Sequence, residues 1–176
     1  MKGLVFSLLC VVGLGLAAPA AAAELKVGDQ APDFTAVDSK LQEVTLGSAK
    51  GKTRIFSVVP SLDTPVCDLQ TKRFNEEAGK LGDAVVVYTV SADLPFAAGR
   101  WCGANNAKNV QCISDHRSMS FGDAWGTHVK ELRLDARAVF VIDAKDKVVH
   151  AEYVKEIAEH PNYDAALAAA RKAAGK

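Results

Sequence analysis

The sequence lacks the residue patterns that several classes of partner and cofactor require. Its 176 residues carry 21 basic and 21 acidic side chains with no block of like charge, so nothing favours nucleic acid or a membrane surface as a partner. Its four histidines show no metal-ligand spacing with one another or with the cysteines. A glycine-rich phosphate loop and a Ser-His-Asp set are also missing. We therefore expect no nucleic-acid partner, no metal and no cofactor.

Long apolar runs are missing too, except at the N-terminus. Residues 3–18 are apolar and uncharged, Lys2 precedes them, and small residues lead from there to Glu24. This pattern is typical of a secretory signal peptide, and the run is a little short for a membrane span. We expect residues 1–23 to be cleaved and residues 24–176 to form one domain, periplasmic or secreted and without stable membrane association. An uncleaved anchor is the alternative.

Cysteine is scarce in the part of the chain that would remain. Cys10 falls within the predicted signal peptide, which leaves Cys67, Cys102 and Cys112. In an oxidising compartment we expect two of these to pair and one to be left over. Three cysteines are too few for a disulfide scaffold, so an apolar core must supply the stability and the cysteines are free for chemistry.

What the sequence does contain is an alternation of strand and helix patterns. Runs rich in β-branched and aromatic residues predict strands at 54–59, 84–90, 138–143 and 147–154, and a small N-terminal hairpin from DFTAVD and EVTL. Helical patterns cover 65–81, 94–104, 119–125 and the segment from 161 onward. The order indicates an α/β domain with a mixed central sheet and helices on both faces, compatible with a thioredoxin-like fold.

One stretch, PSLDTPVC, places a cysteine at the start of a predicted helix. Thr64 is a suitable N-cap and Pro65 suits the first helical position, so Cys67 lies in the first turn. The positive end of the helix dipole there favours a thiolate. Apolar spacing through Phe74 and Leu81 turns Cys67 toward the protein body, where burial opposes the charge and calls for a nearby cation. Helix position alone leaves a reactive thiol and an inert or disulfide-bonded one equally open.

The same stretch contains P-x-x-x-T-x-x-C, which resembles the active-site motif of peroxiredoxins. The longer run PSLDTPVCDLQTKRFNEEA is similar to the thiol peroxidase subfamily. VGDQAPDF, VSADLPFAAGRWCGA and LDARAVFVID resemble that subfamily in the same order, so the similarity spans about residues 26–167. The resemblance implies a thioredoxin-like peroxiredoxin fold and a peroxidase that reduces hydrogen peroxide and organic hydroperoxides.

The resemblance also implies roles for individual residues. Cys67 matches the peroxidatic cysteine, Thr64 the residue that hydrogen-bonds the peroxide, and Pro60 the residue that shields the pocket. Arg137 matches the arginine that stabilises the thiolate and the reacting oxygens, and Cys102 matches the resolving cysteine. The implied cycle forms a Cys67 sulfenic acid, then an intramolecular disulfide with Cys102 after local unwinding, and ends with a thioredoxin-like dithiol donor. A homodimer is also implied.

The sequence departs from the subfamily pattern at two places, and two other functions compete with the peroxidase interpretation. Ala98 stands where the subfamily pattern has a polar glutamine, and the stretch before Arg137 is shorter than usual. Cys112, which the resemblance does not cover, is expected to be a buried free thiol in a strand. An exported thiol–disulfide oxidoreductase would normally show C-x-x-C. The other alternative is a non-enzymatic redox-sensing or copper-handling module on the same fold. Its copper version would need closely paired cysteines with a histidine, which the sequence does not show.

Overall fold

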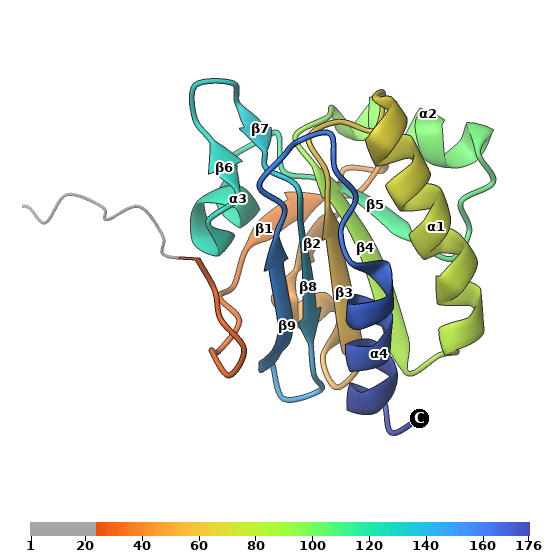
Figure 1. Ribbon diagram of the computed structural model, residues 1–176. Helices are drawn as coiled ribbons and strands as arrows, with labels where there is room; N and C mark the ends of the chain where they lie inside the picture. The colour runs from red at the N-terminus through yellow and green to blue at the C-terminus, as the bar shows by residue number, and fades with distance from the viewer. Residues whose placement is uncertain (1–23) are drawn as a thin grey trace, which may run out of the picture.

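A seven-stranded mixed sheet forms the centre of the domain (Figure 1). The structure, a computed structural model, describes residues 24–176, and the predicted signal peptide lies outside the described residues. In spatial order the strands are β2 (Glu43–Thr45), β1 (Thr35–Val37), β5 (Gln111–Ser114), β4 (Val85–Ser91), β3 (Thr53–Val58), β8 (Ala138–Ile142) and β9 (Val148–Tyr153). A separate two-stranded ribbon consists of β6 (His128–Val129) and β7 (Leu134–Asp135).

The strand pairing confirms the predicted mixed sheet. β3 and β5 flank β4 in parallel register, whereas β8 runs antiparallel to β3 and forms the predicted terminal hairpin with β9. β1 and β2 make the expected N-terminal hairpin. The apolar run of β4 lies in the middle of the sheet, as a strand covered on both faces requires. Helix α1 (Pro65–Leu81) follows β3, so the PSLDTPVC stretch lies at the carboxyl end of a central strand.

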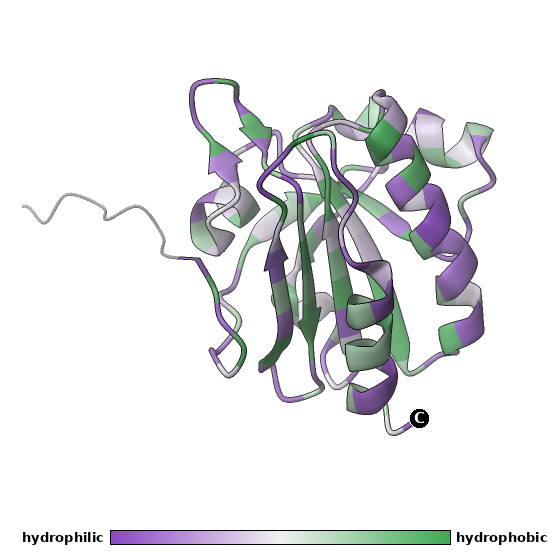
Figure 2. Cartoon of the chain, viewed as in Figure 1, coloured by the Kyte–Doolittle hydropathy of each residue, from purple (hydrophilic) through white to green (hydrophobic). Residues whose placement is uncertain are grey.

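Helices cover both faces of the sheet, and each face has its own apolar cluster. One face packs against α1, α2 (Pro95–Ala104) and α4 (Tyr163–Ala173). The other face packs against α3 (Ser120–Trp125) and the N-terminal segment, through T-shaped and tilted aromatic rings of Phe34, Phe56 and Trp125. The 3-10 turn Leu46–Ala49 precedes β3. The sheet strands are mostly hydrophobic, whereas hydrophilic residues mark the outer side of α1 (Figure 2). Within residues 24–176 no helix is long and apolar enough to cross a bilayer.

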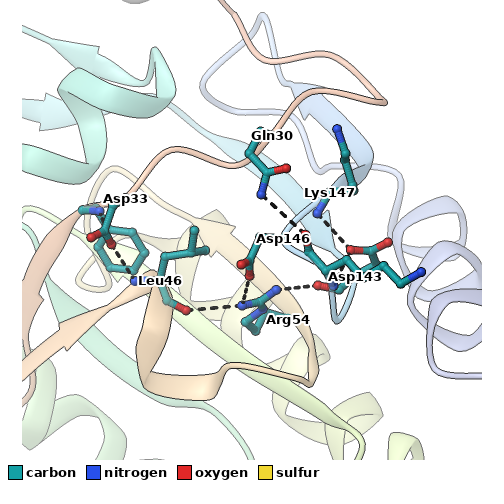
Figure 3. Close-up of polar contacts among 9 residues, drawn as sticks. Gln30, Asp33, Leu46, Arg54, Asp143, Asp146 and Lys147 are labelled. Atoms are coloured by element: carbon teal, nitrogen blue, oxygen red, sulfur yellow. Dashed lines mark hydrogen bonds and ion pairs between the residues drawn. The ribbon is translucent and has the colours of Figure 1, made fainter.

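A fully buried arginine ties several segments together at the end of the sheet away from PSLDTPVC (Figure 3). Arg54, near the start of β3, donates to the Asp146 carboxylate at 2.7 Å and to the carbonyls of Asp143 and Leu46. The Leu46 amide in turn donates to the Asp33 carboxylate at 3.1 Å. A buried charge is tolerated only when it is paired in this way. The network therefore fixes the N-terminal segment and the β8–β9 turn against β3.

Candidate active site

The loop between β3 and α1 places Cys67 inside the protein. Pro60 is buried, α1 begins at Pro65 as predicted, and Cys67 in the first turn has no exposed surface. Thr64 occupies the predicted N-cap position with an extended backbone, but its side chain makes no capping hydrogen bond. Its hydroxyl donates instead to the Ser61 carbonyl at 3.0 Å, because the preceding turn brings that carbonyl within reach.

Arg137 is the cation that was expected beside the buried thiol. Its Nη2 lies 3.4 Å from the Cys67 Sγ, and the same atom donates to the Ile157 carbonyl at 2.7 Å. Arg137 is 2% exposed and stands directly before β8, next to β3, which brings it to the start of α1. Its Nε has no hydrogen-bond partner among residues 24–176. The guanidinium therefore stabilises negative charge on Cys67 and keeps one donor free.

Gln70 positions Arg137, and the sequence prediction missed it. It is fully buried one turn after Cys67, and its Oε1 accepts from the Arg137 Nη1 at 2.7 Å. Its Nε2 donates to the Ser57 hydroxyl at 2.8 Å and lies 3.4 Å from the Val58 carbonyl. The sequence does contain a signal for Gln70, because it lies three positions after Cys67 and residues three apart on a helix share a face. A glutamine on the otherwise buried side of a helix needs buried partners.

A small cavity of about 240 Å³ opens beside this group. Pro60, Thr64 and Arg137 all line it, together with Pro65, Val66, Ile157 and Ala158. Three of the four predicted catalytic residues thus line one cavity. The fourth, Cys67, contacts Arg137 in the cavity wall. The lining is mainly apolar, with one fixed cation and one hydroxyl. This arrangement suits a small ligand that carries oxygen atoms.

Asp93, which the sequence prediction also missed, holds the loop that forms this cavity. Its carboxylate accepts from the Ser61 hydroxyl at 2.8 Å, the Leu62 amide at 2.8 Å and the Ser91 hydroxyl at 2.9 Å. Asp93 lies two residues after the end of β4, so the carboxyl ends of two neighbouring parallel strands meet here. Ligand sites of open α/β sheets lie at such ends.

The cysteine pairing differs from the prediction. Cys102 of α2 is bonded to Cys112 of β5, with Cα atoms 6.9 Å apart, and the free cysteine among the described residues is Cys67. The structure therefore shows a different bond from the Cys67–Cys102 disulfide expected during the catalytic cycle, and the prediction that Cys112 is a free thiol is wrong. The cause is packing that no short motif records: α2 lies on β5, and Cys112 points to the α2 face while Ile113 points to the opposite one.

The neighbours of Cys102 link α2 to the start of α1. The Trp101 Nε1 donates to the Asp68 Oδ1 at 3.2 Å, so α2 contacts the turn that contains Cys67. Ala98, where the subfamily pattern has glutamine, is 1% exposed and belongs to the apolar cluster under α1 and α2. A small apolar side chain fits that buried place.

Together, a mixed sheet of thioredoxin-like topology, a buried thiol at a helix start beside an arginine, and a separate disulfide-bonded pair of cysteines define a thiol-based redox protein. The redoxin family profile matches residues 26–167. The chain is 62% identical over 148 residues to a thiol peroxidase of Bacillus subtilis (strain 168), covering 84% of this chain and 88% of the relative. It is 53% identical over 150 residues to one of Clostridium acetobutylicum, covering 85% and 90%. The chain belongs to the redoxin family and, within it, to the thiol peroxidases.

Solved structures agree with this assignment. A peroxiredoxin-like protein from Aquifex aeolicus superimposes with a TM-score of 0.80 at 42% identity, covering 87% of this chain and 90% of that one. A thiol peroxidase from Chromobacterium violaceum gives a TM-score of 0.73 at 19% identity, covering 84% and 86%, which supports the fold alone. The predicted thioredoxin-like peroxiredoxin fold is confirmed.

Proposed function

We propose that this thiol peroxidase reduces hydrogen peroxide and organic hydroperoxides to water and alcohols through Cys67. The observation that carries the proposal is the 3.4 Å contact between the Arg137 Nη2 and the Cys67 Sγ at the wall of the cavity that Pro60 and Thr64 line. A thiolate is the nucleophile that the reaction requires, and a buried cation stabilises it. Its sulfur attacks one peroxide oxygen, the O–O bond breaks, and the leaving oxygen takes a proton to form water or an alcohol.

The residues around Cys67 have complementary roles in that step. Arg137 lines the cavity, so its charge stabilises the peroxide oxygens, on which negative charge develops as the O–O bond breaks. Thr64 donates its proton to the Ser61 carbonyl, so its oxygen is oriented to accept from the peroxide O–H. Pro60 is buried and excludes water from one side of the cavity. Donors and acceptors that are fixed before the reaction are the most effective.

The cycle continues at Cys102. The Cys67 sulfenic acid condenses with the Cys102 thiol, releasing water and forming an intramolecular disulfide. Because Cys67 is buried in an intact helical turn, that turn has to unwind before its sulfur reaches α2. A thioredoxin-like dithiol donor then reduces the protein.

The location and assembly of the protein belong to the same proposal. The apolar N-terminal stretch supports a cleaved signal peptide over residues 1–23 and a periplasmic or secreted protein. Its electron donor would then be a dithiol protein of the same compartment. Leu94 and Phe96, at the start of α2, are 51% and 64% exposed, and such a patch beside the Asp93 loop fits a homodimer surface.

Stopped-flow fluorescence tests the assignment of Cys67 and Cys102. Reduced protein mixed with equimolar hydrogen peroxide should show a rapid Trp101 signal, which Cys67→Ser abolishes. The Cys102→Ser variant should keep the first step and accumulate a sulfenic acid that dimedone labels. Peroxide consumption at the wild-type rate in Cys67→Ser would refute the assignment. Insulin disulfide reduction without fast peroxide turnover would favour the thiol–disulfide oxidoreductase instead.

A further inference from the structure

We propose that Cys112 is a third redox cysteine, which takes the disulfide over from Cys67 by attacking Cys102. The inference rests on the proposed function, because it assumes that Cys67 and Cys102 first form a disulfide. The observation behind it is the state of the three cysteines. The disulfide joins Cys102 to Cys112, while Cys67 is free, buried and in contact with Arg137.

The three cysteines border the same apolar cluster. Cys67 and Cys112 belong to it, and Cys102 packs against it from α2, next to the Trp101 indole that is bonded to Asp68. Cys102 is partly exposed, whereas Cys112 is 9% exposed and Cys67 is fully buried. Cys102 thus lies in a helix that contacts both the start of α1 and the strand β5, and it is the sulfur that both partners can share.

The pair with Cys112 forms without any change in α1. In this oxidised structure α1 begins at Pro65, and the Asp68 amide donates to the Thr64 carbonyl at 2.9 Å, so the first turn is intact. A Cys67–Cys102 disulfide instead requires that turn to open and separates Cys67 from Arg137. Moving the bond to Cys112 restores both features, and their free energy drives the exchange forward.

The exchange balances without a further reactant. Cys112 gives its proton to water and its sulfur bonds to Cys102, while the Cys67–Cys102 bond breaks and Cys67 leaves as a thiolate. The first turn of α1 then refolds and brings that thiolate back to Arg137, whose charge stabilises the product of the exchange. The dithiol donor then reduces the Cys102–Cys112 bond to two thiols and becomes oxidised itself. Cys102, the more exposed of the two sulfurs, is the one it attacks.

A consequence is that the peroxide site recovers before the donor arrives. Once the bond lies between Cys102 and Cys112, Cys67 is again a thiol in a folded helix beside Arg137. It can take a second equivalent of peroxide, which leaves it as a sulfenic acid because no free cysteine remains to resolve it. Without the transfer, Cys67 stays blocked after the first equivalent.

Tryptic mapping follows the bond directly, because each cysteine falls in a different peptide: residues 55–72, 101–108 and 109–117. The reduced protein is mixed with equimolar hydrogen peroxide, quenched in acid at increasing times, alkylated and digested. The link between 55–72 and 101–108 should appear first and then fall about tenfold while the link between 101–108 and 109–117 rises. Cys67 should become open to alkylation at the same rate.

Three variants make the test decisive. Cys112→Ala, with Cys112→Ser as a second choice should the first fold poorly, should stop at the 55–72 to 101–108 link and consume no second equivalent of peroxide. Cys67→Ser should form no disulfide on this timescale. If the Cys102–Cys112 link arises at the wild-type rate in Cys67→Ser, or if the first link persists in the wild type, the transfer is refuted. The Cys102→Ser sulfenic acid remains the separate check on the function of Cys67.

Discussion

The Arg137 guanidinium joins parts of the chain that are far apart in sequence. Its Nη2 contacts the Cys67 sulfur and the Ile157 carbonyl. Its Nη1 donates to the Gln70 Oε1, which orients the guanidinium. Gln70 is fixed in turn by Ser57 of β3. Without this hydrogen bond the Arg137 side chain could adopt several rotamers, and its position relative to the thiolate would vary. The glutamine therefore matters because it fixes one arrangement before the peroxide binds.

Replacing Gln70 by methionine should slow the reaction of Cys67 with peroxide by about tenfold, the effect of losing one hydrogen bond to a charged group. The change keeps the length of the side chain but removes the acceptor for Arg137 and the donor to Ser57. The second-order rate constant from stopped flow measures the effect. Gln70→Glu, which keeps an acceptor at Arg137, should recover part of the rate; an equal loss in both variants would contradict a positioning role.

Glu77 provides the matched control on the same helix. It is a second buried polar residue of α1, paired with Lys80 at 2.9 Å and with Arg171 of α4 at 3.4 Å, far along the helix from Cys67. These partners hold the pKa of Glu77 below its ordinary value, the Lys80 hydrogen bond most of all. Glu77→Gln should lower the melting temperature and leave the peroxide rate within about twofold of wild type.

At the scale of secondary structure, the sequence predicted α1 correctly because local features determine it. The Thr64-Pro65 pair sets its start, and the apolar spacing through Phe74 and Leu81 sets its buried side, so both its bounds and the inward direction of Cys67 are confirmed. The four long strands were predicted to within a residue or two at each end, since β-branched runs in buried strands are distinctive.

Features that depend on contacts between distant segments were not predicted. The Cys102–Cys112 bond follows from the packing of α2 on β5, and the resemblance pointed to another partner. β6 and β7 are two residues each, too short to leave a periodic signal. The meeting of Arg137 with Cys67 came from the family resemblance, because the two are separated by 70 positions and no local pattern connects them.

The contact between α2 and the first turn of α1 should influence how fast the Cys67–Cys102 disulfide forms. The Trp101–Asp68 hydrogen bond has to break when that turn unwinds. Trp101→Phe removes the donor and keeps most of the ring, so the turn opens more easily and disulfide formation should accelerate by about fivefold, equivalent to about 1 kcal/mol.

Quenched-flow mapping of the 55–72 to 101–108 link measures that rate without tryptophan fluorescence. The initial reaction with peroxide should be unchanged, because among the described residues the Trp101 indole donates to Asp68 and makes no hydrogen bond to Cys67 or Arg137. Asp68→Asn is the control, since its amide oxygen still accepts from the indole. A slower disulfide step in Trp101→Phe would show that the contact guides α2 to Cys67 instead of restraining the turn.

At the scale of the whole molecule, one end of the sheet forms the active site and the other end stabilises the fold. The carboxyl ends of β3 and β4 carry the Cys67 and Asp93 loops, whereas the start of β3 carries the buried Arg54 network. Arg54→Met should destabilise the fold by about 3 kcal/mol, because two carbonyls and the Asp146 carboxylate lose their donor. Urea unfolding measures the loss. The peroxide rate of the folded variant should equal that of the wild type; a loss of more than about tenfold would show that the two ends are coupled.

The stability of the whole domain should also depend on pH through one buried acid near Arg137. The pKa of Asp135 is raised from 3.8 to about 7, mainly by burial and also by the neighbouring Asp115 and Asp123, while Thr127 and His128 oppose the shift. The Asp135 Oδ1 accepts from the Thr127 hydroxyl at 2.8 Å, and its Oδ2 has no partner. The folded protein therefore holds this proton more tightly than the unfolded chain does.

The direction of the pH dependence follows from this difference in pKa between the folded and the unfolded state. The contribution of Asp135 is fully present below its unfolded pKa of 3.8 and is lost as the pH rises through about 7. The loss amounts to about 4 kcal/mol at most. Urea unfolding at pH 5 and pH 8 should show a wild type that is less stable at pH 8, and Asp135→Asn should lose most of this difference because its amide does not ionise. The raised pKa of Asp115 acts in the same direction and accounts for a residual slope in the variant. Equal slopes in wild type and variant would mean that Asp135 is ionised in the folded protein at neutral pH.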